Sequence, residues 1–354
     1  MIQNESIASE FLVTSAPAYA AMAANRLLEK APSVQQQFGD KAFRHWKEHF
    51  QQRLLELSAA IAEKEPRLFS SQVSWSLTAF QAREISPDVL RESLNCLREI
   101  LTEELPESSR QPACDYLDLA LNEMATGHKE EANAEQDNPQ TKLAFQYLLA
   151  VLEGDGHRAI NMITSAVQQG LSLEDAYEKV LLAAQREIGA MWHRAEISIS
   201  EEHYVTSTTQ RTMAVLCHLA QRQPLNGWTI VSAAVAGNSH DIGVRAISDF
   251  FELDGWRAVC LGGDAPDIDI AQSVEYFGAQ LLLISAALST QLKAVRQTIK
   301  HVREISANCK IMVGGAAFAA TPEIWQQLGA DGYASTLSEA LKTGTSLVQS
   351  EHLN

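Results

Sequence analysis

The sequence predicts an all-α N-terminal domain, a four-helix bundle and a C-terminal α/β domain built on a parallel sheet. Apolar residues recur at helical spacing through the first two parts, and short β-rich runs alternate with helical segments in the third. A polar, mostly acidic stretch ending in Asn-Pro separates the first part from the second. We therefore expect domains at residues 1–128, 141–222 and 226–354, with a linker at 129–140.

The second part contains four predicted helices joined by short connections. Glycines end the first helix after residue 153, and Ser172 caps a later one, with Asp175 at the capping-box position. The segment Glu178–Trp192 is apolar on one face, and a last helix runs from about Ser200 to Gln221. Helices of this length with short connections favour a four-helix bundle.

The third part alternates strand and helix five times, starting with WTIVSAAV at residues 228–235. Such repeats predict βαβ units and a doubly wound, Rossmann-like (flavodoxin-like) parallel sheet. Ligands of these sheets bind beyond the carboxyl ends of the strands. The loops that follow the strands are therefore the place to look for a site.

Four of these loops are rich in small residues. A nucleotide-phosphate site would concentrate its glycines as GxGxxG on the first loop, and that motif is absent. Glycines spread over four loops instead predict a slot deep enough for a long tail. A lone loop histidine such as His240 is usually a surface residue, but beside such a slot it can offer a ring nitrogen to a metal. The loop sequences are GNSHDIG (237–243), LGGDAP (261–266), SAALST (285–290) and VGGA (313–316).

These linked motifs resemble the cobalamin-binding domain, whose signature is Asp-x-His-x-x-Gly, then Ser-x-Leu, then Gly-Gly. The resemblance covers about residues 226–348. It implies that His240 ligates cobalt from below, while the displaced dimethylbenzimidazole tail enters a slot lined by Ser285, Gly314 and Gly315. Ser285 would hydrogen-bond the tail. The other cofactor-binding residues that the resemblance implies are Asn238, Ser239, Asp241, Ile242, Gly243, Gly263 and Ala287.

Two positions depart from that signature. Asn238 stands in place of the aspartate and Ala287 in place of the leucine. An aspartate bonded to the ligating histidine can take up a proton as cobalt changes oxidation state, whereas asparagine can orient the ring but cannot titrate. Asn238 therefore argues against a methyl carrier that cycles through cobalt(I), and does not argue against cobalamin binding. Ordinary variation of a core residue is enough to explain Ala287.

A second motif lies just upstream, where Trp192 is followed after nine residues by Glu202-His203. By itself it suggests a core tryptophan and a solvated helix start. Ahead of a cobalamin domain it resembles CarH/LitR-type adenosylcobalamin photoreceptors. The resemblance implies that Trp192 packs on the adenosyl group, that Glu202 and His203 bond its polar atoms, and that His193 captures cobalt after photolysis. Ligation by both His193 and His240 would then create a switch.

The N-terminal domain lacks the DNA-binding pattern usual in those photoreceptors. His45 and His49 lie four residues apart about Trp46, which permits metal or tetrapyrrole contact, although a solvated helix face is the simpler interpretation. The arrangement resembles photocobilins, which pair cobalamin with biliverdin. A dimerisation or partner-docking domain is the alternative. Residues expected to line a core or a pocket are Trp75, Phe80 and Arg83.

Charge and composition limit the partners and the cellular compartment that the sequence allows. The net charge is −16 and no Lys/Arg cluster occurs, which argues against direct binding to nucleic acid. No apolar run reaches the roughly 20 residues of a membrane helix, and no secretory signal is present. Five cysteines without a CxxC pair favour free thiols in the cytoplasm.

These observations favour a cytoplasmic light sensor that uses adenosylcobalamin and has no catalytic residues of its own. We expect it to act through self-assembly as a homo-oligomer or through a protein partner, with biliverdin as a candidate second chromophore. Two alternatives are a corrinoid methyl-carrier protein of a methyltransferase system and a cobalamin-binding antirepressor that docks on a transcription factor. Asn238 and the motif at Trp192 weigh against the carrier.

Overall fold

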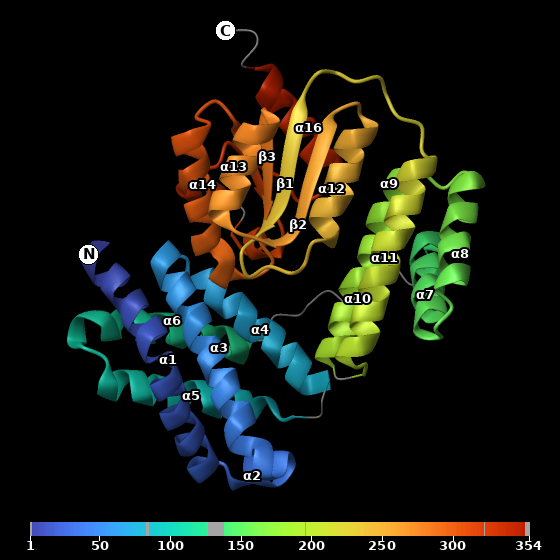
Figure 1. Ribbon diagram of the computed structural model, residues 1–354. Helices are drawn as coiled ribbons and strands as arrows, with labels where there is room; N and C mark the ends of the chain where they lie inside the picture. The colour runs from blue at the N-terminus through green and yellow to red at the C-terminus, as the bar shows by residue number, and fades with distance from the viewer. Residues whose placement is uncertain (1, 83–84, 127–137, 195, 322, 351–354) are drawn as a thin grey trace. The chain divides into compact units, whose positions relative to one another are not determined.

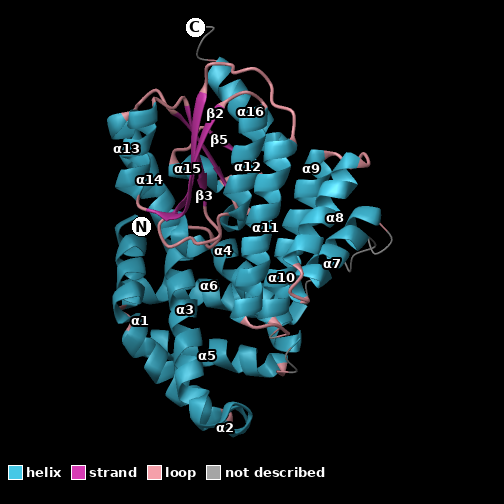
Figure 2. Ribbon diagram, turned by 45° about the vertical axis from the view of Figure 1, so that its right-hand side comes forward, coloured by secondary structure: helices cyan, strands magenta, loops and turns pink. Residues whose placement is uncertain are grey.

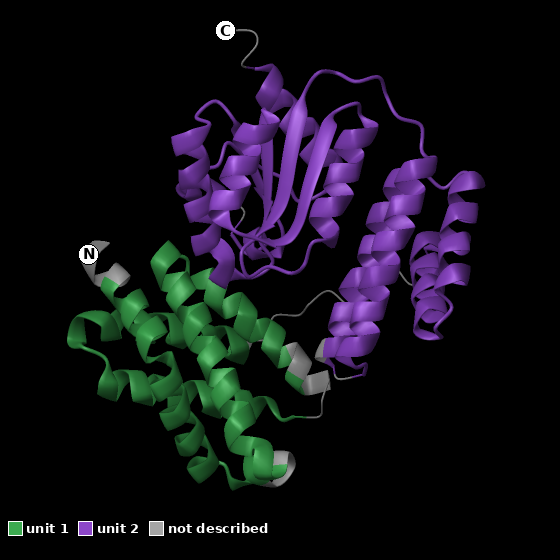
Figure 3. Cartoon of the chain, viewed as in Figure 1, with its two compact units in different colours: residues 1–131 green, residues 132–354 purple. Residues whose placement is uncertain are grey.

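The protein divides into two compact units, residues 1–131 (unit 1) and residues 132–354 (unit 2), which Figure 3 colours separately. Most of the expected linker lies outside the described residues. No helix in the described part of the chain is long and apolar enough to cross a membrane. The computed structural model describes residues 2–82, 85–126, 138–194, 196–321 and 323–350.

Unit 1 is helical, which confirms the predicted class of this domain. Pro32, Pro66 and Pro87 each occupy the first position of a helix, where no backbone N–H is needed for the helical ladder. The helices are α1 (Ile2–Lys30), α2 (Pro32–Phe38), α3 (Ala42–Glu63), α4 (Pro66–Ala82), α5 (Pro87–Glu104) and α6 (Glu107–Thr126), with a 3₁₀ turn at Gly39–Lys41.

The core of unit 1 includes part of the helix face that carries His49, for which the sequence favoured contact with solvent. Trp46 is fully buried, and its ring centroid lies 5.9 Å from that of Phe80. His49 packs on the same Phe80 ring at 5.7 Å, its Nε2 atom is buried, and burial lowers its pKa well below the ordinary value. The simpler interpretation of a solvated face is therefore wrong for His49. Trp75 is 45% exposed, and Arg83 lies outside the described residues.

Unit 2 begins with the predicted four-helix bundle (Figure 1). Ser172 accepts a hydrogen bond from the Asp175 backbone N–H, as the capping pattern predicts. A second capping box, between Ser198 and Glu201, starts the last helix. The elements are α7 (Pro139–Leu152), α8 (Gly156–Gln168), a continuous helix made of α9 (Leu173–Asp175), a wide π-helical turn (Ala176–Leu181) and α10 (Leu182–His193), and finally α11 (Ile199–Leu219).

The rest of unit 2 is a five-stranded parallel sheet in the order β2-β1-β3-β4-β5, which confirms the doubly wound fold. Figure 2 shows α12 and α16 on one face of the sheet and α13 and α14 on the other. The strands are β1 (Thr229–Val235), β2 (Arg257–Ala265), β3 (Leu281–Ser285), β4 (Lys310–Gly314) and β5 (Gly332–Tyr333). The helices are α12 (Ile242–Leu253), α13 (Asp267–Phe277), α14 (Leu292–Ile305), α15 (Ile324–Leu328) and α16 (Leu337–Gln349), with 3₁₀ turns at Ser289–Gln291 and Ala316–Phe318.

The register of the strands brings the expected site loops together. The strand order reverses at β1, so that β2 and β3 lie on opposite sides of it. Ala234 pairs with Ser285, and Ser285 pairs with Gly314, so that β1, β3 and β4 end at the same level. Every residue of β1 is buried. The crevice beyond such a switch point is where doubly wound sheets bind ligands.

The bundle and the sheet domain share one apolar core. Tyr147 and Tyr177 of the bundle are fully buried in it, together with Ile242 and Ala246 of α12 and Leu337 of α16. Because α12 starts directly after the loop that carries His240, the bundle packs beside that loop.

Candidate cofactor site

His240 lies on the loop between β1 and α12, at the carboxyl edge of the sheet, which is the lower edge in Figure 1. The residue is exposed, whereas Asn238 two positions before it is fully buried. The Asn238 Oδ1 atom accepts a hydrogen bond from the His240 backbone N–H at 3.1 Å, and its Nδ2 donates to the Ser285 carbonyl at 3.1 Å. Asn238 therefore fixes the backbone beneath the imidazole and ties the first loop to the third.

Two side chains that the sequence analysis did not single out complete this clamp. The Gln291 Oε1 atom accepts from the backbone N–H groups of Ala287 and Leu288 at 2.8 and 3.0 Å, and its Nε2 donates to the Gly237 carbonyl at 2.8 Å. On the other side, Asp264 Oδ1 accepts from the Gly237 N–H at 2.7 Å. The His240 loop is thus hydrogen-bonded to both of its neighbours.

The glycines of the site are required mainly by close backbone approaches. A Cβ atom on Gly315, whose φ is +103°, would lie 2.2 Å from the Ala286 carbonyl oxygen. On Gly314 it would lie 2.9 Å from the Ala334 carbonyl oxygen, and on Gly263 it would lie 3.1 Å from that of Asn238. Gly243 differs, because a Cβ there would meet nothing within 4 Å. Gly243 therefore leaves open space of the kind that a close-lying ligand would use.

Unpartnered hydroxyls test whether the residues beneath these loops fit a polar cofactor tail. Ser232 on β1 and Ser289 after β3 are buried, and neither Oγ atom has a hydrogen-bond partner among the described residues. Burying a hydroxyl without a partner costs about 1–3 kcal/mol. Ser285 is half-buried at the end of β3. A ligand that brings polar atoms into this region would offset that cost, so the residues fit the tail of a cobalamin.

The bundle carries the second predicted group of residues at one end. Trp192 lies in the last turn of α10 and is 42% exposed, so it is not the core residue of the simpler interpretation. Glu202 and His203 lie in the first turns of α11, with Glu202 Oε2 2.6 Å from His203 Nδ1 and Glu202 Oε1 accepting from Thr206 Oγ1 at 2.9 Å. The side chain of His193 lies outside the described residues.

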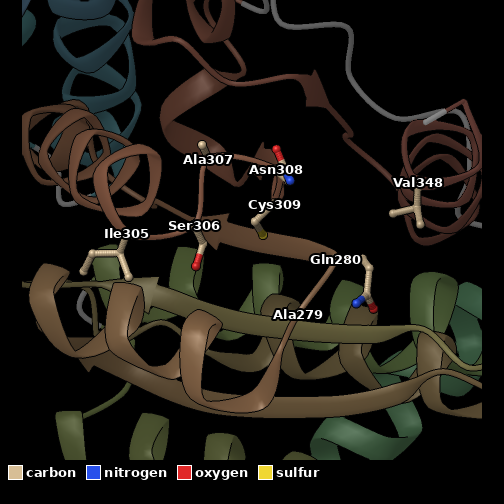
Figure 4. Close-up of a pocket in the computed structure, with 8 residues that line it drawn as sticks. All are labelled: Ala279, Gln280, Ile305, Ser306, Ala307, Asn308, Cys309 and Val348. Carbon is tan, nitrogen blue, oxygen red and sulfur yellow. The ribbon is translucent and has the colours of Figure 1, made fainter. Parts of the chain in front are cut away.

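A separate hollow lies at the opposite edge of the sheet. Figure 4 shows it between the segments that enter β3 and β4, with Gln280, Ser306 and Cys309 among its lining residues. Because it faces the amino ends of the strands, it is not the crevice in which doubly wound sheets bind ligands.

Two family models, both described as B12 binding domain, match residues 228–342 and 143–216. Dimethylamine corrinoid protein 3 of Methanosarcina mazei is 31% identical to this chain over 121 residues, which are 34% of this chain and 71% of that protein. The chain belongs to the B12-binding corrinoid proteins. This confirms the cobalamin-binding prediction for unit 2.

Two further corrinoid proteins extend the comparison. A corrinoid protein of Desulfitobacterium hafniense is 24% identical over 206 residues, which are 56% of this chain and 94% of that protein. The structure of the monomethylamine corrinoid protein of Methanosarcina barkeri shares the fold, with a TM-score of 0.52 at 20% identity, over 59% of this chain and 99% of that chain. None of these relatives is described as a photoreceptor, so light sensing by this corrinoid protein stays a prediction.

Proposed function

We propose that this corrinoid protein holds cobalamin against the loops at the carboxyl edge of its sheet, with His240 as the lower cobalt ligand. The exposed imidazole of His240, on a loop that Asn238 and Gln291 clamp to its neighbour, carries the proposal. A loop fixed before binding loses little conformational entropy when the ligand arrives. When bound, cobalamin supplies a cobalt atom that holds an alkyl group and releases it to an acceptor or on absorbing light.

The first candidate for the use of that cobalt is the carriage of a methyl group for a partner methyltransferase. The relatives named as dimethylamine and monomethylamine corrinoid proteins support it. In this role the chain contributes the carrier and its partner contributes the catalytic residues. Five free cysteines support a reducing, cytoplasmic setting for such a complex.

The second candidate is light sensing with adenosylcobalamin, and residues at two places favour it. Asn238 cannot take up a proton, and both of its hydrogen bonds go to backbone atoms. Trp192 offers an exposed indole at the end of the bundle that carries Glu202 and His203. An indole can pack on adenosine, and the acidic and imidazole groups can bond its polar atoms.

The lower ligand is tested by replacing His240. We expect His240→Ala to weaken cobalamin binding at least about tenfold and to change the visible spectrum, because the nitrogen on cobalt is lost. His218→Ala removes another exposed histidine, in the last turn of α11, and is the matched control that keeps wild-type affinity. Unchanged colour and affinity in His240→Ala would remove the proposal.

The upper ligand is tested by comparing two cofactor forms in the dark. A sensor binds adenosylcobalamin through Trp192, so Trp192→Ala weakens adenosylcobalamin binding and leaves methylcobalamin binding unchanged. Ile199→Ala, another exposed apolar residue near that end of the bundle, is the control. Illumination should then change the oligomeric state. A methyl carrier instead gives equal effects on the two forms, ignores light and passes its methyl group to a partner enzyme.

For unit 1 we propose a second ligand, with biliverdin as the first to test. Arg53 is 4% exposed, and no described residue hydrogen-bonds its Nε and Nη1 atoms or the buried Nε2 of His49. The Trp46 and Phe80 rings lie beside His49. A flat tetrapyrrole with carboxylates could use both kinds of group. Absence of a red-absorbing complex on titration would leave partner docking as the role of this unit.

A further inference from the structure

Asp241, the residue after His240, joins the histidine loop to the helical bundle. It is 7% exposed. Its Oδ1 atom accepts from Gln210 Nε2 of α11 at 3.0 Å, and its Oδ2 accepts from Arg245 Nε of α12 at 2.6 Å. One carboxylate therefore bonds the bundle with one oxygen and the sheet domain with the other.

This contact differs from the other polar contacts between bundle and sheet domain. Tyr177 donates to Asp249 in the third turn of α12, and Glu178 accepts from the Leu337 N–H at the start of α16. Within the described residues, the Gln210–Asp241 hydrogen bond is the one between side chains of the bundle and of the histidine loop. A displacement of α11 therefore acts on this loop through Asp241.

Asp241 has little freedom to exchange Gln210 for another partner. Arg245 lies one helical turn after it and forms an ion pair with it. A Cβ on Gly262 of β2 would lie 3.0 Å from Arg245 Nη2 and 3.4 Å from Asp241 Oδ2, so the pair is packed against this backbone. Movement of the bundle must either break the bond to Gln210 or pull Asp241, and with it His240.

We infer that the Gln210–Asp241 hydrogen bond couples the position of the helical bundle to the ligation of cobalt by His240, which makes both side chains positioning residues. The inference rests on the proposed role of His240. Coupling of this kind is reciprocal. The bundle position in which Gln210 bonds Asp241 favours the histidine-bound form of the cofactor, and histidine ligation favours that bundle position. A partner protein that moves α11 would thereby change how readily His240 holds the cofactor.

The test measures the ratio of histidine-bound to histidine-free cobalt(II) cofactor over a range of temperatures. Electron paramagnetic resonance of ¹⁵N-labelled protein with unlabelled cobalamin distinguishes a protein nitrogen from the cofactor's own base. We expect Gln210→Ala to lower this ratio at least about tenfold, because a hydrogen bond to a charged group is lost. The control is Gln185→Ala, since Gln185 bonds Thr206 and Thr209 within the bundle.

A double variant guards against a merely structural effect. Gln210→Glu with Asp241→Asn exchanges donor and acceptor across the same contact and leaves an oxygen for Arg245, so it should restore the ratio that each single change lowers. A ratio unchanged in Gln210→Ala, or lowered equally in Gln185→Ala, would overturn the coupling. If no protein nitrogen binds cobalt in the wild-type protein, the proposed role of His240 is wrong. If the wild-type protein shows that nitrogen and Gln210→Ala leaves the ratio unchanged, only the coupling is wrong.

Discussion

Two buried amide side chains in the sheet loops are satisfied within the chain, whereas a buried ion pair in the core of unit 1 is left short of partners. Asn238 and Gln291, 0% and 6% exposed, use both ends of their amides in hydrogen bonds to neighbouring loops. Arg53 and Glu56, both 4% exposed, pair with each other at 3.0 Å, yet Arg53 Nε and Nη1 find no hydrogen-bond acceptor among the described residues. Each unmet buried donor costs about 1–3 kcal/mol.

The two regions therefore differ in how their ligand-free structure is prepared for binding. The loops that carry His240 keep their geometry through contacts within the chain, so binding adds to a structure that is already formed. The core around Arg53 holds donors that no described residue accepts from, so we expect its most stable form to include a ligand or water.

The largest loss of stability is expected from adding one methyl group to the hydrogen-bonded loops around His240. Gly315→Ala places a Cβ at 2.2 Å from the Ala286 carbonyl at a φ of +103°. It should lower the free energy of unfolding of unit 2 by about 3 kcal/mol or more. Gly243→Ala is the matched variant, because its Cβ has open space. It should unfold in urea like the wild type and bind cobalamin more weakly. Equal unfolding curves for Gly315→Ala would show that the loop is not tightly packed.

Removing the clamp should have the next largest effect. Gln291→Ala leaves the backbone N–H groups of Ala287 and Leu288 without their acceptor, which costs about 2 kcal/mol in urea unfolding and weakens cobalamin binding. Gln280 makes a comparable pair of backbone contacts at the opposite edge of the sheet. Gln280→Ala should lose stability and keep its cofactor affinity. If both variants lose affinity equally, the clamp is not specific to the site.

In unit 1 we expect a substitution to raise the stability of the protein rather than to lower it. Replacing the buried pair by Arg53→Met and Glu56→Leu together removes the unmet donors and should raise the stability of the ligand-free protein by about 1–3 kcal/mol. Arg53→Met alone leaves Glu56 buried without its cation and should destabilise. Thermal unfolding followed by circular dichroism compares the two. A double variant less stable than either single variant would show that the pair is satisfied in the native core.

The smallest expected effect is a pH dependence at the contact between bundle and sheet domain. Burial raises the pKa of Asp249 to about 6, although a hydrogen bond from Tyr177 opposes the shift. The native state therefore binds more protons than the unfolded state between the ordinary carboxyl pKa and about 6, and stability falls as pH rises through this interval, by about 1 kcal/mol after allowance for solvent screening. Asp249→Asn should remove this slope from unfolding curves measured at several pH values. An unchanged slope would place its origin elsewhere.

The sequence supports prediction where the cause is local or repeats with a period. Alternating runs indicate the parallel strands, Ser172 marks a helix start, and the glycines locate the crowded loops. Gln291 bonds Gly237, 54 residues away, and Gln210 bonds Asp241, 31 residues away, and no local pattern predicts such contacts. The one signal for Gln291 was its position just after a loop of small residues.

Unit 1 shows the limit of helical periodicity. The four-residue spacing of His45 and His49 is compatible with a solvated face and with a buried one, and neighbouring apolar side chains decide between them only after the helices pack. Trp46 and Phe80 enclose His49. The same spacing argument cannot anticipate that Arg53 lies beneath the surface, because arginine is rarely buried.

The proposed cofactor site requires that a nitrogen of His240 binds cobalt. Label only the histidines with ¹⁵N, bind unlabelled cobalamin, reduce it to cobalt(II), and record the electron paramagnetic resonance spectrum. Coordination by a protein imidazole predicts that each cobalt line splits in two, and that His240→Ala abolishes this pattern. A threefold splitting that persists in the labelled wild-type protein would identify the cofactor's own base as the ligand and contradict the account.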